Sequence, residues 1–216
     1  MANYLGPNLV TSGLVLCLDA GNTKSYPGTG TTWTDLSGNG STGTLTGGPT
    51  FNSSFGGSIS FDGVDDYIAV PSLGTLSAYT ISYWARRDSE NRMLVSSGTG
   101  ASFYWYGDNS WRYTHGGVGG EYYYPKPTSI PVSTWGNYIV TYNGSAVRIY
   151  RQGVFQGQQS TTGTANFSMG LRFGWFEGGN SYSFLGLASN FQVYSRALSD
   201  AEVQQNFTAL RGRFGI

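Results

Sequence analysis

The stretch WGNYIVTYNGSAVRIYRQGVFQGQ runs from Trp135 to Gln158. Its residues follow the period of two that is typical of β-strands with one buried face. Asn143-Gly144 separates YIVTY from SAVRIY, and this dipeptide predicts a type I′ hairpin turn. Gln152-Gly153 closes the next pair of strands less distinctively. The stretch therefore predicts three short antiparallel strands in succession.

The same period continues along most of the chain. We expect strands at Leu14–Leu18, Thr42–Gly47, Gly57–Gly63, Tyr67–Val70 and Tyr79–Arg86, and in the runs 92–97, 102–107, 110–115, 171–176 and 184–198. The 33 glycines and the 16% of aromatic residues suit short strands joined by tight turns. Because no repeat and no break in composition divides the chain, we predict one all-β sandwich domain over residues 1–216, with a short N-terminal arm at 1–12.

One segment near the C-terminus is predicted to be helical. Ser199 with Glu202 three residues later forms a capping box pattern. Leu198 precedes the cap and can pack on Val203 as a hydrophobic staple. The sequence therefore predicts a single short amphipathic helix with a tail, over residues 199–216.

The charge balance narrows the classes of partner. Charged residues make up 11% of the chain, and twelve Lys and Arg balance twelve Asp and Glu. We therefore expect neither nucleic-acid binding nor attraction to an anionic membrane. No stretch approaches the roughly 20 apolar residues of a membrane helix, and no signal peptide pattern is visible, which predicts synthesis in a reducing cytoplasm. The single cysteine, Cys17, is expected to be buried, and His115 in YTHGG to lie in an exposed loop.

Five segments in order along the chain resemble the laminin-G-like domains of the concanavalin A-like lectin and glucanase superfamily. The segments are Gly13–Leu45, with the distinctive W-x-D-L-S-G-N-G at Trp33–Gly40, then Gly57–Val70, Tyr79–Arg86, Trp135–Val154 and Leu187–Phe207. The resemblance implies a jelly-roll β-sandwich of two antiparallel sheets with one short C-terminal helix. It covers nearly the whole chain.

Leu18–Gly40 together with Asn206–Ile216 also resembles virion proteins of tailed phages, notably marine and cyanobacterial ones. This resemblance implies a capsid decoration, a fibre or a tail appendage that is assembled in the host cytoplasm and located in the virion. Its partners would be other virion subunits, a further copy of the chain, or host surface polysaccharide. We therefore expect a structural virion protein without enzymatic activity, with a lectin-like host-glycan receptor-binding module as the alternative.

The carboxylates allow a metal site more readily than a catalytic site. A glycoside hydrolase needs two carboxyl groups roughly 5–9.5 Å apart around one sugar bond, and Asp65 and Asp66 would point to opposite faces if they lay in a strand. Hydrolysis therefore remains a distant alternative. Some laminin-G-like domains bind one calcium ion at the sandwich rim, which implies a structural Ca²⁺ held by Asp35, Asn39, Asp65 and Asp66. Asn190 stands where many relatives carry Asp, and this difference removes one negative charge from the expected calcium site. Asp and Asn are also common in turns that bind no metal, so an ordinary turn is the alternative.

Aromatic residues gather between positions 102 and 125. In a strand at 103–106, alternate side chains face opposite sides, so one face would be left to meet a ligand or a subunit. The exposed face could contact another subunit, because Tyr, Trp and Arg are enriched at protein interfaces. It could instead bind a glycan, because flat rings stack on sugars. The third alternative is that both faces are buried in the sandwich. The predicted contact residues are Tyr104, Trp105, Tyr106, Trp111, Arg112, Tyr113, Tyr122, Tyr123 and Tyr124.

Overall fold

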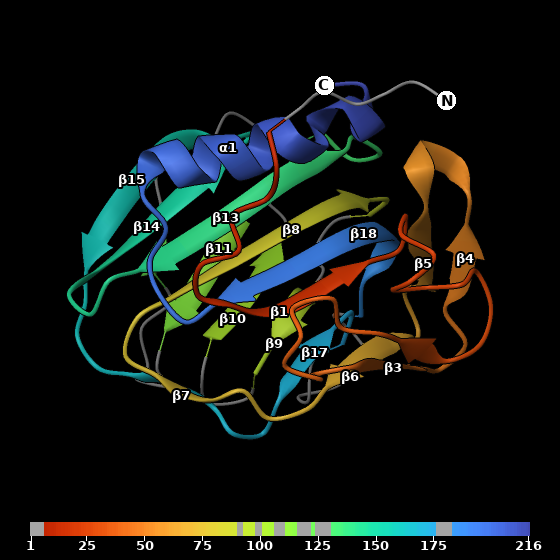
Figure 1. Cartoon of the computed structure of the whole chain (residues 1–216), viewed down its shortest axis with the longest axis horizontal. Coiled ribbons are helices and arrows are strands. Elements are labelled where there is room, and N and C mark those ends of the chain that lie inside the picture. The colour runs from red at the N-terminus through yellow and green to blue at the C-terminus, as the bar shows by residue number, and fades with distance from the viewer. Residues whose placement is uncertain are drawn as a thin grey trace.

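A computed structural model describes residues 7–89, 93–97, 101–105, 111–115, 122–123, 131–175 and 183–216. Within these ranges, the side chains at 93, 94, 104, 111, 112, 122 and 123 are not described. Two antiparallel sheets of eight strands each lie face to face (Figure 1). The predicted β-sandwich of two antiparallel sheets is confirmed.

The first sheet is built around the long strand β18. Its order is β15 (Val154–Ser160), β14 (Ala146–Arg151), β13 (Gly136–Tyr142), β8 (Tyr79–Arg87), β18 (Leu185–Tyr194), β5 (Ser58–Asp62) and β4 (Thr50–Asn52). The short 3₁₀-helix η1 (Ser54–Gly56) links β4 to β5. β5 pairs with the first half of β18, and β1 (Leu14–Asp19) pairs with its second half. The N-terminal part of the chain is thereby joined to its C-terminal part.

The second sheet combines strands from distant parts of the chain. Its order is β12 (Tyr122–Tyr123), β11 (Trp111–His115), β10 (Ala101–Trp105), β9 (Met93–Ser96), β17 (Leu171–Phe173), β6 (Tyr67–Val70), β3 (Gly43–Thr46) and β2 (Thr32–Trp33). A separate pair joins β16 (Ala165–Phe167) to β7 (Gly74–Leu76). Strands that are distant in sequence, such as β6 and β17, are neighbours here.

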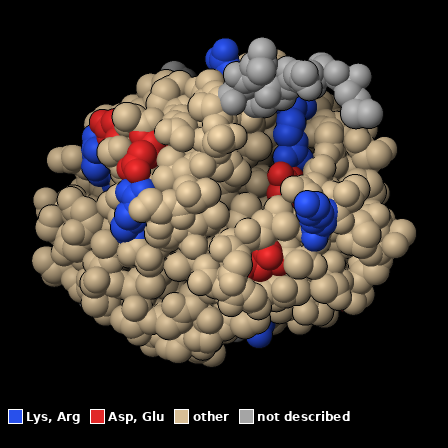
Figure 2. Space-filling view, in the orientation of Figure 1, with Lys and Arg blue, Asp and Glu red and all other residues tan. Residues whose placement is uncertain are grey.

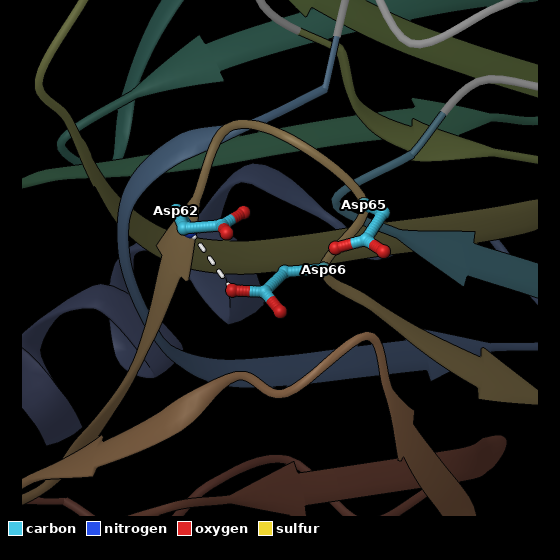
Figure 3. A group of neighbouring side chains, drawn as sticks. All are labelled: Asp62, Asp65 and Asp66. Atoms are coloured by element: carbon cyan, nitrogen blue, oxygen red, sulfur yellow. Dashed lines mark hydrogen bonds between the residues drawn. The ribbon is translucent and has the colours of Figure 1, made fainter.

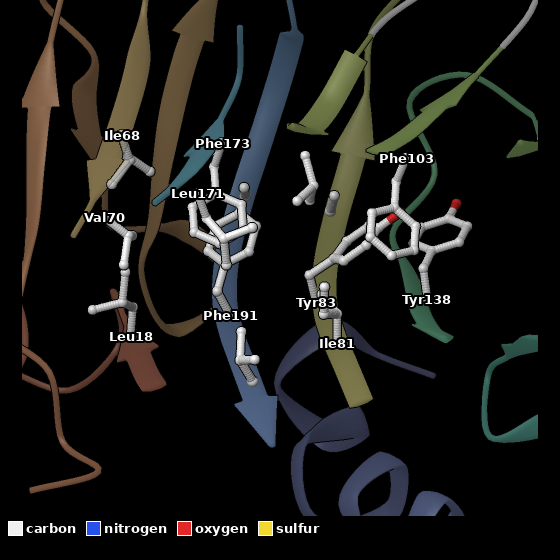
Figure 4. Close-up of a cluster of buried hydrophobic side chains, with 14 of the residues drawn as sticks. Leu18, Ile68, Val70, Ile81, Tyr83, Phe103, Tyr138, Leu171, Phe173 and Phe191 are labelled. Atoms are coloured by element: carbon white, nitrogen blue, oxygen red, sulfur yellow. The ribbon is translucent and has the colours of Figure 1, made fainter. Parts of the chain in front are cut away.

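The core fills the space between the two sheets with large rings (Figure 4). Phe191 of the first sheet meets Phe173 of the second, with 3.8 Å between the ring centroids. Tyr83 and Phe103 form an edge contact at 5.9 Å across the same interior. Each buried aromatic side chain removes a large apolar area from water, so these cross-sheet pairs are a main source of stability.

The helix α1 (Asp200–Leu210) packs on the outer face of the first sheet. Ser199 caps it by accepting a hydrogen bond from the backbone of Glu202, and the reciprocal bond is present, which confirms the capping box. The chain continues into the 3₁₀-helix η3 (Arg211–Phe214), where Phe214 stacks on Trp84 at 4.2 Å. α1 and η3 thus cover an aromatic patch of the first sheet.

Most predicted strands are confirmed within one or two residues, and the hairpin turn differs from its prediction. The two central residues of the turn are Gly144 and Ser145, because Asn143 donates its backbone N–H to the carbonyl oxygen of Ala146. Only Gly144 has a left-handed φ, which is the type II′ pattern rather than type I′. The side-chain oxygen of Asn143 accepts the backbone N–H groups of Ser145 and Ala146 and holds this turn.

Two single residues test the expected burial. Cys17 is buried as predicted, and burial raises the pKa of its thiol to about 12, so the thiol stays protonated and unreactive. The prediction that His115 lies in an exposed loop is wrong. His115 ends β11 with 1% of its surface exposed, and its Nδ1 lies 2.9 Å from the hydroxyl of Tyr79. Its ring also packs against Tyr142, with 4.2 Å between the centroids.

The face that carries α1 is largely uncharged (Figure 2). Acidic and basic side chains pair with each other, as in the ion pairs of Arg213 with Asp19 at 2.8 Å and of Arg148 with Asp200 at 2.5 Å. None of the described helices is both long and apolar enough to cross a membrane.

Candidate functional site

The turn between β5 and β6 brings three carboxylates together (Figure 3). Asp62, Asp65 and Asp66 each offer an oxygen within 4.8 Å of the others. Asp65 and Asp66 lie between the two strands, as the predicted strand bounds imply, so the divergence of neighbouring strand residues does not apply to them. We call these three residues the acidic turn.

Asp66 is the structural member of the acidic turn. Its side chain is 3% exposed, and its carboxylate accepts the backbone N–H of Asp62 at 2.9 Å. Burial raises the pKa of this carboxyl group, and the neighbouring carboxylates Asp62 and Asp65 raise it further, while the bond from the Asp62 backbone lowers it. Asp62 and Asp65 are exposed. The trio could supply three oxygens to a cation, and a calcium ion would need further carbonyl or water ligands.

The predicted ligand set is corrected at Asp35. Its carboxylate turns inward and is 8% exposed, and its Oδ1 accepts the backbone N–H groups of Cys17 and Ser37, both at 2.8 Å. Its Oδ2 accepts the hydroxyl of Ser37 at 2.7 Å and the backbone N–H of Ser41 at 3.1 Å. With its oxygens engaged in this way, Asp35 stabilises the loop and the edge of β1 and has no part in the acidic turn.

Asn39 belongs to the same loop as Asp35. Its amide nitrogen donates to the carbonyl oxygen of Leu14 at 3.1 Å and to the hydroxyl of Ser37 at 3.0 Å. Within the described residues, the acidic group consists of Asp62, Asp65 and Asp66. Asp62, which the prediction left out, therefore replaces Asp35 beside Asp65 and Asp66.

The predicted aromatic contact surface is corrected at two positions. Trp105 and Tyr113 are each 1% exposed and lie in the core with Phe103, because this side of β10 and β11 faces the first sheet. They cannot serve as surface contacts. The other predicted residues lie outside the described side chains or outside the described ranges, namely Tyr104, Tyr106, Trp111, Arg112, Tyr122, Tyr123 and Tyr124.

A different aromatic cluster lies on the outer face of the second sheet. The rings of Tyr67 and Trp175 stack at 5.5 Å with 26° between their planes. The guanidinium of Arg172 lies 4.9 Å from the ring centre of Trp175 and 5.6 Å from that of Tyr67. All three side chains are partly exposed. We call these three residues the platform.

Strand alternation and one glycine build the platform. Ile68 and Phe173 point into the core, so Tyr67 and Arg172 point outward from the paired strands β6 and β17. Gly174 follows with φ of 104°, where a Cβ would lie 2.8 Å from the carbonyl oxygen of Asp66. Only glycine fits this close approach, which brings Trp175 back over Tyr67.

Sequence reasoning missed the platform. The alternation of β6 and β17 indicates which side chains point outward. The pairing of these strands joins residues more than a hundred positions apart, and no local pattern encodes that pairing. The acidic turn ends one residue before Tyr67, so the motif that carries the family resemblance also leads into the platform.

The described residues thus form two stacked antiparallel sheets with a partly exposed cluster of two aromatic rings and a guanidinium on one outer face. The family model of the concanavalin A-like lectin/glucanases superfamily matches residues 62–204. The chain belongs to this superfamily.

Solved structures share the fold at low sequence identity. Domain 4 of the extracellular GH43 arabinanase AbnA from Geobacillus stearothermophilus, in complex with arabinotriose, is 18% identical with a TM-score of 0.70 over 91% of this chain and 98% of that domain. The binding domain of Paraclostridial Mosquitocidal Protein 1 is 18% identical with a TM-score of 0.73 over 90% of this chain and 52% of that one. The receptor-binding domain of botulinum neurotoxin type G is 16% identical with a TM-score of 0.69 over 91% of this chain and 51% of that one.

The chain therefore spans about half the length of the two toxin domains. No curated protein matches it by sequence.

Proposed function

We propose that this chain is a non-catalytic, lectin-like domain that binds glycans through the platform. The observation that carries the proposal is the partly exposed stack of Tyr67 on Trp175 with Arg172 against both rings. Aromatic rings offer an apolar face to a sugar ring, and the N–H groups of a guanidinium donate to sugar hydroxyls. The structural neighbours, an arabinanase domain solved with arabinotriose and toxin receptor-binding domains, support a binding role.

The acidic turn argues against glycoside hydrolysis. Two catalytic carboxyl groups must flank the scissile bond, whereas these three come from a single turn. Asp66 is nearly buried and engaged with the backbone of Asp62, so it is poorly placed to give a proton to a substrate. The geometry suits a structural or ion-binding turn better than a catalytic pair.

The test is affinity electrophoresis of the purified chain through gels that contain defined polysaccharides. Trp175→Ala and Tyr67→Ala are expected to weaken retention about tenfold, because each removes a ring that contacts the sugar. Phe155→Ala removes an exposed ring on β15 of the other sheet and is the control for loss of a surface ring. Equal retention of all variants, or no retention of the wild type by any glycan, would refute the proposal.

A tailed-phage virion is the proposed setting, and the resemblance of Leu18–Gly40 and Asn206–Ile216 to phage proteins favours it. In the structural alternative, the chain acts through contacts with other virion subunits. Mass spectrometry of purified particles tests the setting. Adsorption to host cells then separates the two roles: soluble oligosaccharide blocks adsorption by a receptor-binding module and has no effect on a purely structural subunit.

A further inference from the structure

We infer that the platform binds neutral glycan chains and discriminates against polyanionic ones. This inference rests on the proposed function and adds the class of ligand. It follows from the residues that surround Tyr67, Arg172 and Trp175 on the outer face of the second sheet.

On the β3 and β6 side of the platform, the described residues that point outward are small, and two of them carry hydroxyl groups. Thr44, Ala69 and Arg172 face one another across β3, β6 and β17. Thr46 lies opposite Tyr67 in the same way. Both threonines are exposed, and Ala69 carries only a methyl group between two longer side chains. The methyl group of Ala69 would not obstruct a sugar ring stacked on the platform, and the threonine hydroxyl groups beside it donate and accept hydrogen bonds.

The charges beside the platform select against anions. Arg172 is the one cation of the platform, and the acidic turn begins at Asp62 and ends directly before Tyr67. Asp62 and Asp65 are exposed and carry two negative charges. Among the described residues of the platform and the acidic turn, two exposed carboxylates outnumber one guanidinium, so a polyanionic chain would meet net negative charge. Exposed carboxylates also accept hydrogen bonds from the hydroxyl groups of a neutral sugar. The whole chain has no net charge that would attract a polyanion from a distance.

The experiment compares neutral and anionic polysaccharides on the intact chain. Linear arabinan, β-glucan and galactomannan are the neutral probes; polygalacturonate, alginate and heparin are the anionic probes. Binding is measured by affinity electrophoresis and by quenching of tryptophan fluorescence at low ionic strength, where attraction between charges reaches farthest. A chelator is present, so that the carboxylates keep their full charge.

Two pairs of variants test the site. Ala69→Gln places a long neutral side chain beside the platform and is expected to weaken binding of the neutral glycan about tenfold. Val154→Gln introduces the same side chain on the exposed edge strand β15 and is expected to change nothing. Asp65→Lys reverses a charge two residues before Tyr67 and is expected to create binding of anionic probes, whereas Asp200→Lys, on α1 at the outer face of the first sheet, is not. Near-ultraviolet circular dichroism verifies that each variant is folded.

The outcomes separate the inference from the proposed function. Retention by a neutral probe that Ala69→Gln weakens supports both. Retention that Trp175→Ala weakens but that Ala69→Gln and Asp65→Lys leave unchanged overturns the inference alone, and glycan binding at the platform then stands. Tighter binding of an anionic probe by the wild type also overturns the inference. If no probe of either class is retained, both fail.

Discussion

Replacing Asp35 tests whether its carboxylate stabilises the loop motif at Trp33–Gly40 and anchors it to β1. The Asp35 carboxylate accepts four hydrogen bonds, one of them from the backbone N–H of Cys17 in β1. In Asp35→Ala, that N–H is left without an acceptor inside the protein, at a residue with 5% exposed surface. An unsatisfied buried donor costs about 1–3 kcal/mol, and the hydrogen bonds from Ser37 and Ser41 add to this loss.

The expected destabilisation is about 3 kcal/mol, because groups near the surface regain water as a partner. For a domain of this size, such a loss lowers the Tm by about 6–12 °C. The loss is measured by urea unfolding followed through tryptophan fluorescence and by calorimetry. Asp35→Asn keeps one acceptor oxygen and puts an N–H donor in the place of the other. We therefore expect its free energy of unfolding to lie between that of the wild type and that of Asp35→Ala.

The control is Asp88→Ala, which removes a partly exposed carboxylate that pairs with Arg86 at 2.8 Å. Exposed ion pairs of this kind contribute about 0–1 kcal/mol. If Asp35→Ala costs no more than this control, the loop does not depend on the Asp35 carboxylate and the reasoning fails.

Three further predictions concern acid, calcium and the C-terminal tail. Burial lowers the pKa of His115, so its contribution to stability is full above about pH 6.5. As the pH falls below this value, the free energy of unfolding decreases by at most about 1.4 kcal/mol per pH unit. In urea titrations between pH 6.5 and 5, His115→Gln should reduce this decrease, and an unchanged pH dependence would contradict the prediction. If the acidic turn binds Ca²⁺, a chelator is expected to lower the Tm of the wild type. Asp65→Asn should abolish this decrease in Tm, and Asp35→Asn should retain it. A wild-type Tm that does not change in chelator would reject the calcium hypothesis. Phe214→Ala removes the ring stacked on Trp84 and should cost about 3 kcal/mol, with a change in near-ultraviolet circular dichroism; a loss below about 1 kcal/mol would show that this stack contributes little.

Local signals in the sequence were sufficient for the elements of the fold. The alternation in Tyr67–Val70 predicts that strand at the bounds observed, and Ser199 with Glu202 predicts the start of α1, because both patterns act within a few residues. Very short strands such as β2 and β7 were missed, since two or three residues carry no period. Family resemblance supplied the arrangement of the two sheets, which no local pattern encodes.

The candidate site shows what local patterns leave open. Alternation showed that Trp105 and Tyr104 point to opposite faces, but only the facing sheet decides which of these faces is buried, and it buries Trp105. For the acidic residues, the sequence shows how many carboxylates are present but does not show which groups they bond to. Asp35 is engaged with the backbone of Cys17, eighteen residues away.

The sequence by itself determined that this chain forms short strands, one capped helix and a largely neutral surface, because period, capping and charge are properties of neighbouring residues or of the whole composition. Only the tertiary structure brought the residues of the platform together. Tyr67 and Trp175 are distant in sequence and stack because β6 pairs with β17 and Gly174 passes against Asp66. Long-range pairing of this kind depends on the packing of both sheets at once.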